Sequence, residues 1–354
     1  MKKLEPKGKI AYTTYMSDFG GVGYIRTIMP SVILGSLRYK KMSFEPTYLM
    51  RYVSSTEWYN NQSFVKFQRS ATQEQLKMIK HFRTFTAQQT NTPLIYEIDD
   101  LLFNIPKSNF ASDYYEENKP YIEEMLQLVS GVTVSTPFLR DYYKLYNSNV
   151  SVVKNRLAKC LWGDIKEYEP VNEKPRIIYP GSQNHFGVKG RTEEGGDIGP
   201  DLMNFIKKTK KDYEWMFIGA IPEELKNDKD IKHIPWVHYI SYPQFIKNCN
   251  ADIGIAPLQI NDFNRGKSNL KMLEYSASGI PGVYTDIEPY KDCRLTTENE
   301  NAMIDQIQWL VENPQKRYEV WSSDTKKIRN DLFLEDNIVK YVNEHLKLFN
   351  QKIE

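Results

Sequence analysis

Cysteine is scarce in this sequence. The 354 residues include three cysteines, Cys160, Cys249 and Cys293. They are too few and too widely spaced for a disulfide framework or a zinc site. We therefore expect reduced thiols, as in a cytosolic protein.

Long apolar runs are also missing. No stretch approaches the ~18 residues that a membrane-spanning helix needs. The first ten residues, MKKLEPKGKI, contain lysines with no apolar segment behind them, unlike a secretion signal. These absences predict a cytoplasmic protein without stable membrane insertion.

The chain lacks the polar excess of a disordered protein. Hydrophobic residues make up 40% and charged residues 26%, and 24 Tyr and 16 Phe supply apolar surface. The length suits two domains with separate cores.

Charge is unevenly distributed. The net charge is +2, but residues 1–90 contain 14 Lys and Arg against 5 Asp and Glu, a net of +9, which leaves −7 for the rest. A basic part of this kind suits a polyanion or an anionic surface as partner. A solvated lysine-rich face explains it equally well, so both interpretations stay open.

Short β-rich apolar runs alternate with helical patterns, which indicates an α/β protein with parallel sheets. In the first half, strands are expected at 9–15, 47–53, 64–68, 94–99, 131–135 and 150–153, and helices at 24–37, 72–90, 120–128 and 137–145. In the second half, strands are expected at 176–179, 214–218, 231–234, 252–256 and 282–284, and helices at 200–210, 242–249, 268–278, 300–312 and 314–329.

The pattern stops at Trp162–Pro175, where charges and prolines indicate an interdomain linker. We expect an N-terminal domain over residues 1–165 and a C-terminal domain over residues 174–334. The stretch Glu335–Phe349 has the pattern of one amphipathic helix. Two such domains would form a cleft between the carboxyl ends of their sheets, where α/β proteins bind ligands.

A glycine-containing loop, Ser17–Arg26, follows the first expected strand. Gly21 and Gly23 would let the backbone approach a ligand, and the helix that follows favours an anion. Arg26 stands where the dinucleotide fingerprint needs glycine or alanine, which argues against NAD. A plain tight turn is the alternative.

Two adjacent acids, Asp99 and Asp100, end another apolar strand at the expected cleft. Paired carboxylates can bind a metal, orient an acceptor hydroxyl or transfer protons. They can equally cap the turn that follows.

A third loop, Tyr179–His185, follows the first strand of the second half. Gly181 and Ser182 offer backbone amides and a hydroxyl suited to phosphate. His185 stands in this polar loop at a strand end, a place consistent with either a functional or a structural role.

The segment Asp262–Pro281 is the most specific. It contains Gly266-Lys267-Ser268, but Asn261 stands where a Walker A loop needs glycine. A helix is expected to begin near Ser268.

Charged residues are spaced along one face of that expected helix. Lys267 stands at its N-terminus, Lys271 one turn on and Glu274 three residues further. A cation and the free amides of the first turn, at Ser268 and Asn269, would hold a diphosphate, and the carboxylate would take the two hydroxyls of a ribose. A lysine at a helix N-terminus opposes the macrodipole, which favours a bound anion over a plain amphipathic helix.

At this segment the chain resembles the retaining, family-4-like glycosyltransferases of the GT-B class. Their donor segment reads Glu-x7-Glu, then small residues and Gly-x-Pro. Glu274 matches the second glutamate, and the first falls on Gly266, so how the sugar hydroxyls are held stays open. Gly279–Pro281 matches the Gly-x-Pro ending. The spacing of Lys267 and Lys271 matches a divergent bacterial and phage branch, which the chain also resembles at Gly20–Arg26, Gln68-Arg69, Tyr96–Phe103 and Gly181–His185.

The resemblance implies two Rossmann-like domains with a nucleotide-sugar, a UDP-sugar favoured, in the cleft, and a final helix (335–354) that completes the first domain. Lys267 and Arg265 would neutralise the diphosphate leaving group, Glu274 would bind the ribose, and Gly181 and Ser182 would line the phosphates or base. Most such enzymes need no metal, because cations stabilise the charge. No metal or other cofactor is therefore expected.

The resemblance also implies transfer of a hexose or pentose with retention. An inverting enzyme would need a base in the first domain, where the only histidine, His81, stands far from any expected strand end. Asp18, Asp99 or Asp100 could substitute.

The acceptor would meet the basic first domain. A 5-hydroxymethylated pyrimidine in phage DNA fits best, with the double strand bound through its phosphates and the base flipped into the cleft. A lipid-linked or polysaccharide acceptor is the alternative, with residues 28–41 on anionic lipid. A catalytically dead nucleotide-binding protein is a further hypothesis. The cations expected to face the acceptor are Lys9, Arg26, Arg38, Lys40, Lys41, Arg51, Lys66 and Arg69.

Overall fold

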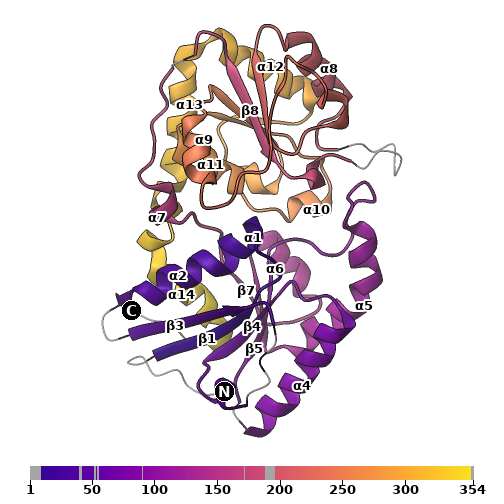
Figure 1. The fold of residues 1–354 in the computed structure, drawn as a ribbon, viewed down its shortest axis with the longest axis vertical. Helices are drawn as coiled ribbons and strands as arrows, with labels where there is room; N and C mark the ends of the chain where they lie inside the picture. Colours follow the sequence, from indigo (N-terminus) through magenta and orange to yellow (C-terminus); the bar gives the residue numbers. More distant parts are fainter. Residues whose placement is uncertain are drawn as a thin grey trace.

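The computed structural model describes residues 9–39, 42–51, 53, 56–89, 91–170, 172–187 and 196–351. They form two α/β halves, one above the other in Figure 1, each built on its own sheet. All strand pairs are parallel except that of β2 with β3, so the expected α/β class with parallel sheets is confirmed.

The first half has a seven-stranded sheet in the order β2-β3-β1-β4-β5-β6-β7. Its strands are β1 (Lys9–Tyr15), β2 (Arg38–Tyr39), β3 (Met42–Leu49), β4 (Phe64–Gln68), β5 (Leu94–Ile98), β6 (Gly131–Val134) and β7 (Val150–Val152). Its helices are α1 (Gly21–Gly23), the π-helix η1 (Tyr24–Ile28), α2 (Met29–Ser36), α3 (Thr56–Asn60), α4 (Gln73–Gln89), α5 (Ser112–Leu128), α6 (Pro137–Tyr143) and α7 (Lys159–Trp162). The central strands β4 and β5 are buried along their whole length, as helix-covered parallel strands are.

The second half has a six-stranded sheet in the order β10-β9-β8-β11-β12-β13. Its strands are β8 (Arg176–Gly181), β9 (Glu214–Gly219), β10 (Lys232–Ile234), β11 (Ile253–Ala256), β12 (Gly282–Thr285) and β13 (Thr296–Thr297). Its α-helices are α8 (Pro200–Thr209), α9 (Tyr242–Asn248), α10 (Asp262–Arg265), α11 (Leu270–Ser278), α12 (Glu300–Glu312) and α13 (Pro314–Ile328). Short 3-10 turns are η2 (Gln183–His185), η3 (Glu223–Leu225), η4 (Glu288–Tyr290) and η5 (Arg329–Asp331).

The end of the chain packs against the first sheet. The stretch expected as one helix is divided into η6 (Glu335–Asn337), α14 (Ile338–Leu346) and η7 (Lys347–Phe349). Side chains of α14 share a buried cluster with Ile10 and Tyr12 of β1. Arg156 donates two hydrogen bonds to the Glu344 carboxylate, at 2.9 and 2.8 Å, and so fixes α14 to the segment after β7.

The bounds of several elements differ from the sequence-based expectation, and the two largest differences involve a proline. A strand is expected at residues 47–53, after Pro46, whereas β3 spans Met42–Leu49 and includes the proline. Pro46 is aligned with β1, whereas β2 pairs only with Met42 and Ser43, so one side of β3 is open at the proline and a missing N–H is tolerated.

α5 likewise continues through a proline. It begins at Ser112, well before the expected start at Pro120, and the proline side chain is exposed on the helix surface. Water can therefore reach the carbonyl group that loses its helical partner. Within the residues described here, no helix has the length and apolar character to cross a membrane.

Candidate functional site

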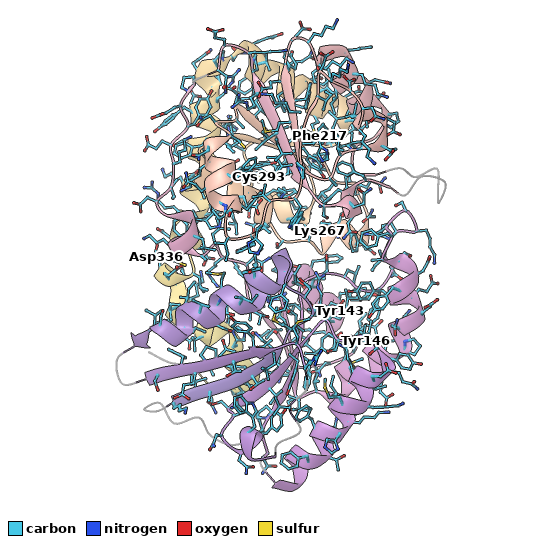
Figure 2. The ribbon with its side chains drawn as sticks, in the orientation of Figure 1. Tyr143, Tyr146, Phe217, Lys267, Cys293 and Asp336 are labelled. Carbon is cyan, nitrogen blue, oxygen red and sulfur yellow. The ribbon has the colours of Figure 1, made fainter. Side chains whose placement is uncertain are left out.

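A cavity of about 400 Å³ lies between the two halves. The loops after β1, β4 and β5 line it on one side, and the loops after β8, β9 and β10 together with α11 line it on the other. Figure 2 shows Lys267 at this boundary. The cavity therefore lies at the carboxyl ends of strands from both sheets, where α/β proteins bind ligands.

Most of the residues singled out in the sequence come together here. The cavity is lined by Gly21, Asp99, Asp100, Gly181, Ser182, His185, Lys267, Ser268, Lys271 and Glu274. Gly23, Arg265 and Asn269 are not among its lining residues.

Two glycines keep the strand ends of the second sheet free of side chains. Gly219 ends β9 with φ +93°, and a Cβ there would lie 2.5 Å from the Gly181 carbonyl oxygen. A Cβ at Gly181 would lie 2.9 Å from Cε1 of Tyr179. Glycine is required at position 219 by its positive φ and by the neighbouring backbone of β8, whereas at position 181 it leaves room for the Tyr179 ring of the same strand. Ser182 follows at the cavity wall.

Glu274 is the centre of a polar group on α11. Its Oε2 accepts a hydrogen bond from Lys271 Nζ at 3.0 Å and another from the Tyr242 hydroxyl at 3.1 Å. Burial, together with the neighbouring Glu274 carboxylate, raises the pKa of Tyr242 well above its usual value. The phenol therefore stays protonated and acts as a donor to the carboxylate.

Lys267 has no counterion among the described residues. Its Nζ lies 4.6 Å from the ring centroid of Phe263. The nearby carboxylates of Asp262 and Glu288 pair with Arg265, and that of Glu274 pairs with Lys271. Asn155 Nδ2 donates to Ser268 Oγ at 2.8 Å, which ties this loop to the chain that follows the first sheet. An ammonium group without a counterion in a cavity favours the binding of an anion.

Arg69 holds the Asp99–Asp100 pair on the opposite wall. Its Nε donates to Asp99 Oδ1 at 2.6 Å and its Nη2 to Asp100 Oδ2 at 3.1 Å. Although burial opposes it, the two carboxylates raise the pKa of Arg69. Arg69 has φ +46°, a strained conformation that packing must maintain. Within the described part of the chain, no group of three or more His, Cys, Asp or Glu is placed to hold a metal ion.

Arg265 lies beside the cavity, in contacts of its own. Its Nε donates to Glu288 Oε1 at 2.8 Å and its Nη1 to Asp262 Oδ1 at 3.1 Å. The guanidinium also lies 4.9 Å from the ring centroid of Phe138 in α6. The contact with Phe138 joins α10 to the first half, and the two ion pairs mean that Arg265 would need to rearrange to reach a ligand.

The structure gives a physical reason for glycine at position 266. A Cβ there would lie 2.9 Å from Leu139 Cδ2 and 3.4 Å from Leu101 Cβ, both in the first half. Thr136 Oγ1 donates to the Gly266 carbonyl oxygen at 3.3 Å, and Phe263 belongs to the first half's buried cluster. Close packing of the two halves thus leaves little room for a larger side chain at this position.

Several cations expected to face an acceptor have other partners. Arg26 and Lys66 are buried, 4% and 2% exposed, so the prediction that they face an acceptor is wrong. Arg26 Nε donates to Glu97 Oε1 at 2.7 Å, and burial lowers the pKa of Lys66 to about 8. Lys9 pairs with Glu45. Lys40, Lys41 and the side chain of Arg38 lie outside the described residues.

The helix expected to lie on lipid is also built into the core. Ile33 and Leu34 of α2 belong to the same buried cluster as Tyr12 of β1. Val32 is the large apolar side chain that α2 exposes. The apolar face of α2 therefore stabilises the first half.

Two lining or supporting residues give no signal in the sequence. Trp236, after β10, lines the cavity with 64% of its surface exposed. Asp197 Oδ2 lies 2.7 Å from His185 Nδ1. A single tryptophan in a loop forms no periodic pattern from which its place at a cavity could be predicted. The contact of Asp197 with His185 becomes visible only in the folded structure.

Comparisons with known proteins identify the fold. No family model matches the chain, and no curated protein sequence matches it either. Among solved structures, TarM aligns with a TM-score of 0.54 and 15% identity, over 81% of this chain and 55% of TarM. The chain thus spans little more than half the length of TarM.

Two further structures align over almost the whole chain. The N-terminal domain of a Candida albicans trehalose-6-phosphate phosphatase has a TM-score of 0.52 and 8% identity, over 97% of this chain and 98% of that domain. The glycotransferase of kitacinnamycin has a TM-score of 0.41 and 10% identity, over 98% of this chain and 100% of its own. The fold is that of the GT-B glycosyltransferases, as the sequence resemblance implied. At these identities the comparisons show the fold alone.

Proposed function

We propose that this chain is a glycosyltransferase that binds a nucleoside-diphosphate sugar in the cavity and transfers the sugar to an acceptor hydroxyl. One observation carries the proposal. In a GT-B fold, Lys267 faces the cavity without a described counterion, together with Ser182 after β8 and Glu274 of α11. The volume of about 400 Å³ is within the range of small-molecule sites.

The donor would lie mainly on the second half. Lys267 and the amides after Gly181 would hold the diphosphate and stabilise its charge as the bond to the sugar breaks. Glu274 would accept hydrogen bonds from the ribose hydroxyls. Tyr242 and Lys271 donate to its Oε2 and would hold the carboxylate in place. Trp236, exposed at the cavity wall, is a surface for a base such as uracil.

Asp99 and Asp100 would lie on the acceptor side, where they can orient a hydroxyl. Their ion pairs with Arg69 leave them without an evident role as free base, which favours the retaining reaction. The cations would provide the electrostatic stabilisation that a metal supplies elsewhere. Arg265 would join them only after leaving Glu288.

The acceptor proposal remains a hydroxymethylated pyrimidine in DNA, with a lipid-linked sugar or polysaccharide as the alternative. The burial of Arg26 and Lys66 removes two of the eight cations that favoured DNA. The burial of Ile33 and Leu34 removes the lipid-facing helix. The structure therefore weakens the charge argument for DNA and the apolar-helix argument for a lipid surface.

A transfer assay tests the proposal. Purified protein is incubated with UDP- and GDP-sugars, with and without 5-hydroxymethylcytosine DNA, and released nucleotide and DNA mass are measured. A sugar-sized mass gain of the DNA supports the DNA acceptor. Nucleotide release without a mass gain indicates that the sugar goes to water or to an acceptor other than DNA. Lys267→Ala should lower release, whereas Lys316→Ala, an exposed lysine on α13, should not. Nucleotide binding without release from any donor would favour a dead enzyme.

A further inference from the structure

The His185 imidazole is held by a carboxylate that the other site residues do not use. His185 Nδ1 lies 2.7 Å from Asp197 Oδ2. Asp197 Oδ1 accepts two more hydrogen bonds, from the Gln259 backbone N–H at 2.8 Å and from Asn264 Nδ2 at 2.9 Å. The Asp197 side chain is 7% exposed and that of His185 18%. Asp197 is thus fixed by two segments before it meets the imidazole.

These contacts define the tautomer of His185. A carboxylate that accepts from Gln259 and Asn264 is an acceptor, so Nδ1 must carry the hydrogen that lies between His185 and Asp197. The second ring nitrogen, Nε2, is left for the cavity that His185 lines. No hydrogen bond to Nε2 is formed by the described residues.

Burial and two nearby ammonium groups oppose protonation of the His185 ring. Burial lowers the pKa of His185 below its usual value, the ammonium groups of Lys267 and Lys271 lower it further, and Asp197 acts in the opposite direction. On the β8 side the ring meets Tyr179 edge to face, with centroids 6.1 Å apart. Without a ligand, Nε2 is therefore a neutral acceptor beside two cations.

We propose that His185 takes up a proton from solvent on Nε2 when the diphosphate of the donor binds, and donates it as a hydrogen bond to a phosphate oxygen, with Asp197 as the positioning residue. A diphosphate would cancel the repulsion from Lys267 and Lys271, and its own negative charge would act together with Asp197 against the effect of burial. The imidazolium adds a positive charge to the leaving group's environment. This inference rests on the proposed function.

Calorimetry in buffers of different ionisation enthalpy tests the inference. UDP, or GDP where UDP does not bind, is titrated into the wild type at pH 7.5 in HEPES and in Tris, because a phosphate buffer would compete for the site. The slope of apparent enthalpy against buffer enthalpy gives the number of protons taken up. The nucleotide's own terminal phosphate contributes equally for every variant, so the difference between wild type and variant reports His185.

We expect the wild type to take up about 0.5 to 1 proton more than His185→Gln or Asp197→Asn. Asp212→Asn, at an exposed acid after α8, should behave as the wild type. If Asp197→Asn fails to fold, His185→Gln decides alone. Equal proton uptake in wild type and His185→Gln, with binding intact, overturns the inference. Absence of nucleotide binding by the wild type overturns the proposed function instead.

Discussion

At the residue scale, Lys267 is the cavity-lining cation for which no ion pair is seen among the residues that the structure describes. Lys271 is paired with Glu274 and Arg69 with two aspartates, whereas Lys267 contacts an aromatic ring. A hydrogen bond from such a cation to a ligand contributes about 1.5–3 kcal/mol, more than one between neutral groups. Substitution of single side chains in this site should therefore have effects that can be measured one at a time.

Glu274→Gln should remove the preference for a ribose. If the carboxylate accepts from both ribose hydroxyls, the wild type binds UDP about tenfold or more tightly than 2′-deoxy-UDP. The variant should bind the two nucleotides within about twofold of each other, because a charged acceptor becomes a neutral one. Titration calorimetry measures both affinities. Glu319→Gln, at an exposed position on α13, is the control, and an unchanged preference in Glu274→Gln would refute the ribose assignment.

Asp324 offers a test of stability away from the cavity. Its Oδ1 accepts from the Arg294 N–H at 2.6 Å, whereas its buried Oδ2 has no hydrogen-bond partner in the described structure. Burial raises the pKa of Asp324 to about 6. This value is above the unfolded pKa of about 3.9, so ionisation destabilises the fold at pH 7. The penalty decreases as the pH falls from about 6 and is lost near the unfolded pKa.

Asp324→Asn keeps the carbonyl acceptor and removes the charge. It should raise the free energy of unfolding by roughly 1–3 kcal/mol at pH 7 and by much less at pH 4. Urea denaturation at the two pH values measures this, with Asp212→Asn as control. A variant no more stable than the wild type at pH 7 would show that the carboxylate is not strained.

At the element scale, local sequence and tertiary context divide the predictions. β1 and β4 have the predicted bounds, because apolar runs between polar residues determine them. β3 could not be predicted, since only its place beside β1 shows that Pro46 is harmless. The π-helix η1 lies inside an expected α-helix, and the sequence pattern does not distinguish the two. In the site, motifs at strand ends were recognisable, whereas Asp197 needs the fold to meet His185.

Gly266 is where α6 and the loop before α11 meet. Gly266→Ala should lower the free energy of unfolding by about 1 kcal/mol, because the Leu139 methyl 2.9 Å from the new Cβ can shift. Gly266→Glu should cost about 3 kcal/mol or more and weaken nucleotide binding, because it forces the halves apart. Urea denaturation and calorimetry measure both. Tighter nucleotide binding by Gly266→Glu would mean that the family's glutamate fits after all.

At the scale of the whole molecule, the two halves are held together by both polar and apolar contacts. Asn155 reaches Ser268, Thr136 reaches the Gly266 carbonyl, and Phe263 is part of the first half's buried cluster. The terminal α14 returns to the first sheet. These contacts bring Lys267 of the second half and Asp99 and Asp100 of the first half to the same cavity.

The central claim is that this cavity binds the diphosphate of a nucleotide-sugar. Calorimetric titration of UDP against UMP, and of GDP against GMP, tests it in the wild type, Lys267→Ala and Lys316→Ala. The account predicts that the wild type and Lys316→Ala bind the matching diphosphate at least about tenfold more tightly than the monophosphate, and that Lys267→Ala loses most of this preference. Equal affinity of the wild type for diphosphate and monophosphate, or an unchanged preference in Lys267→Ala, would contradict it.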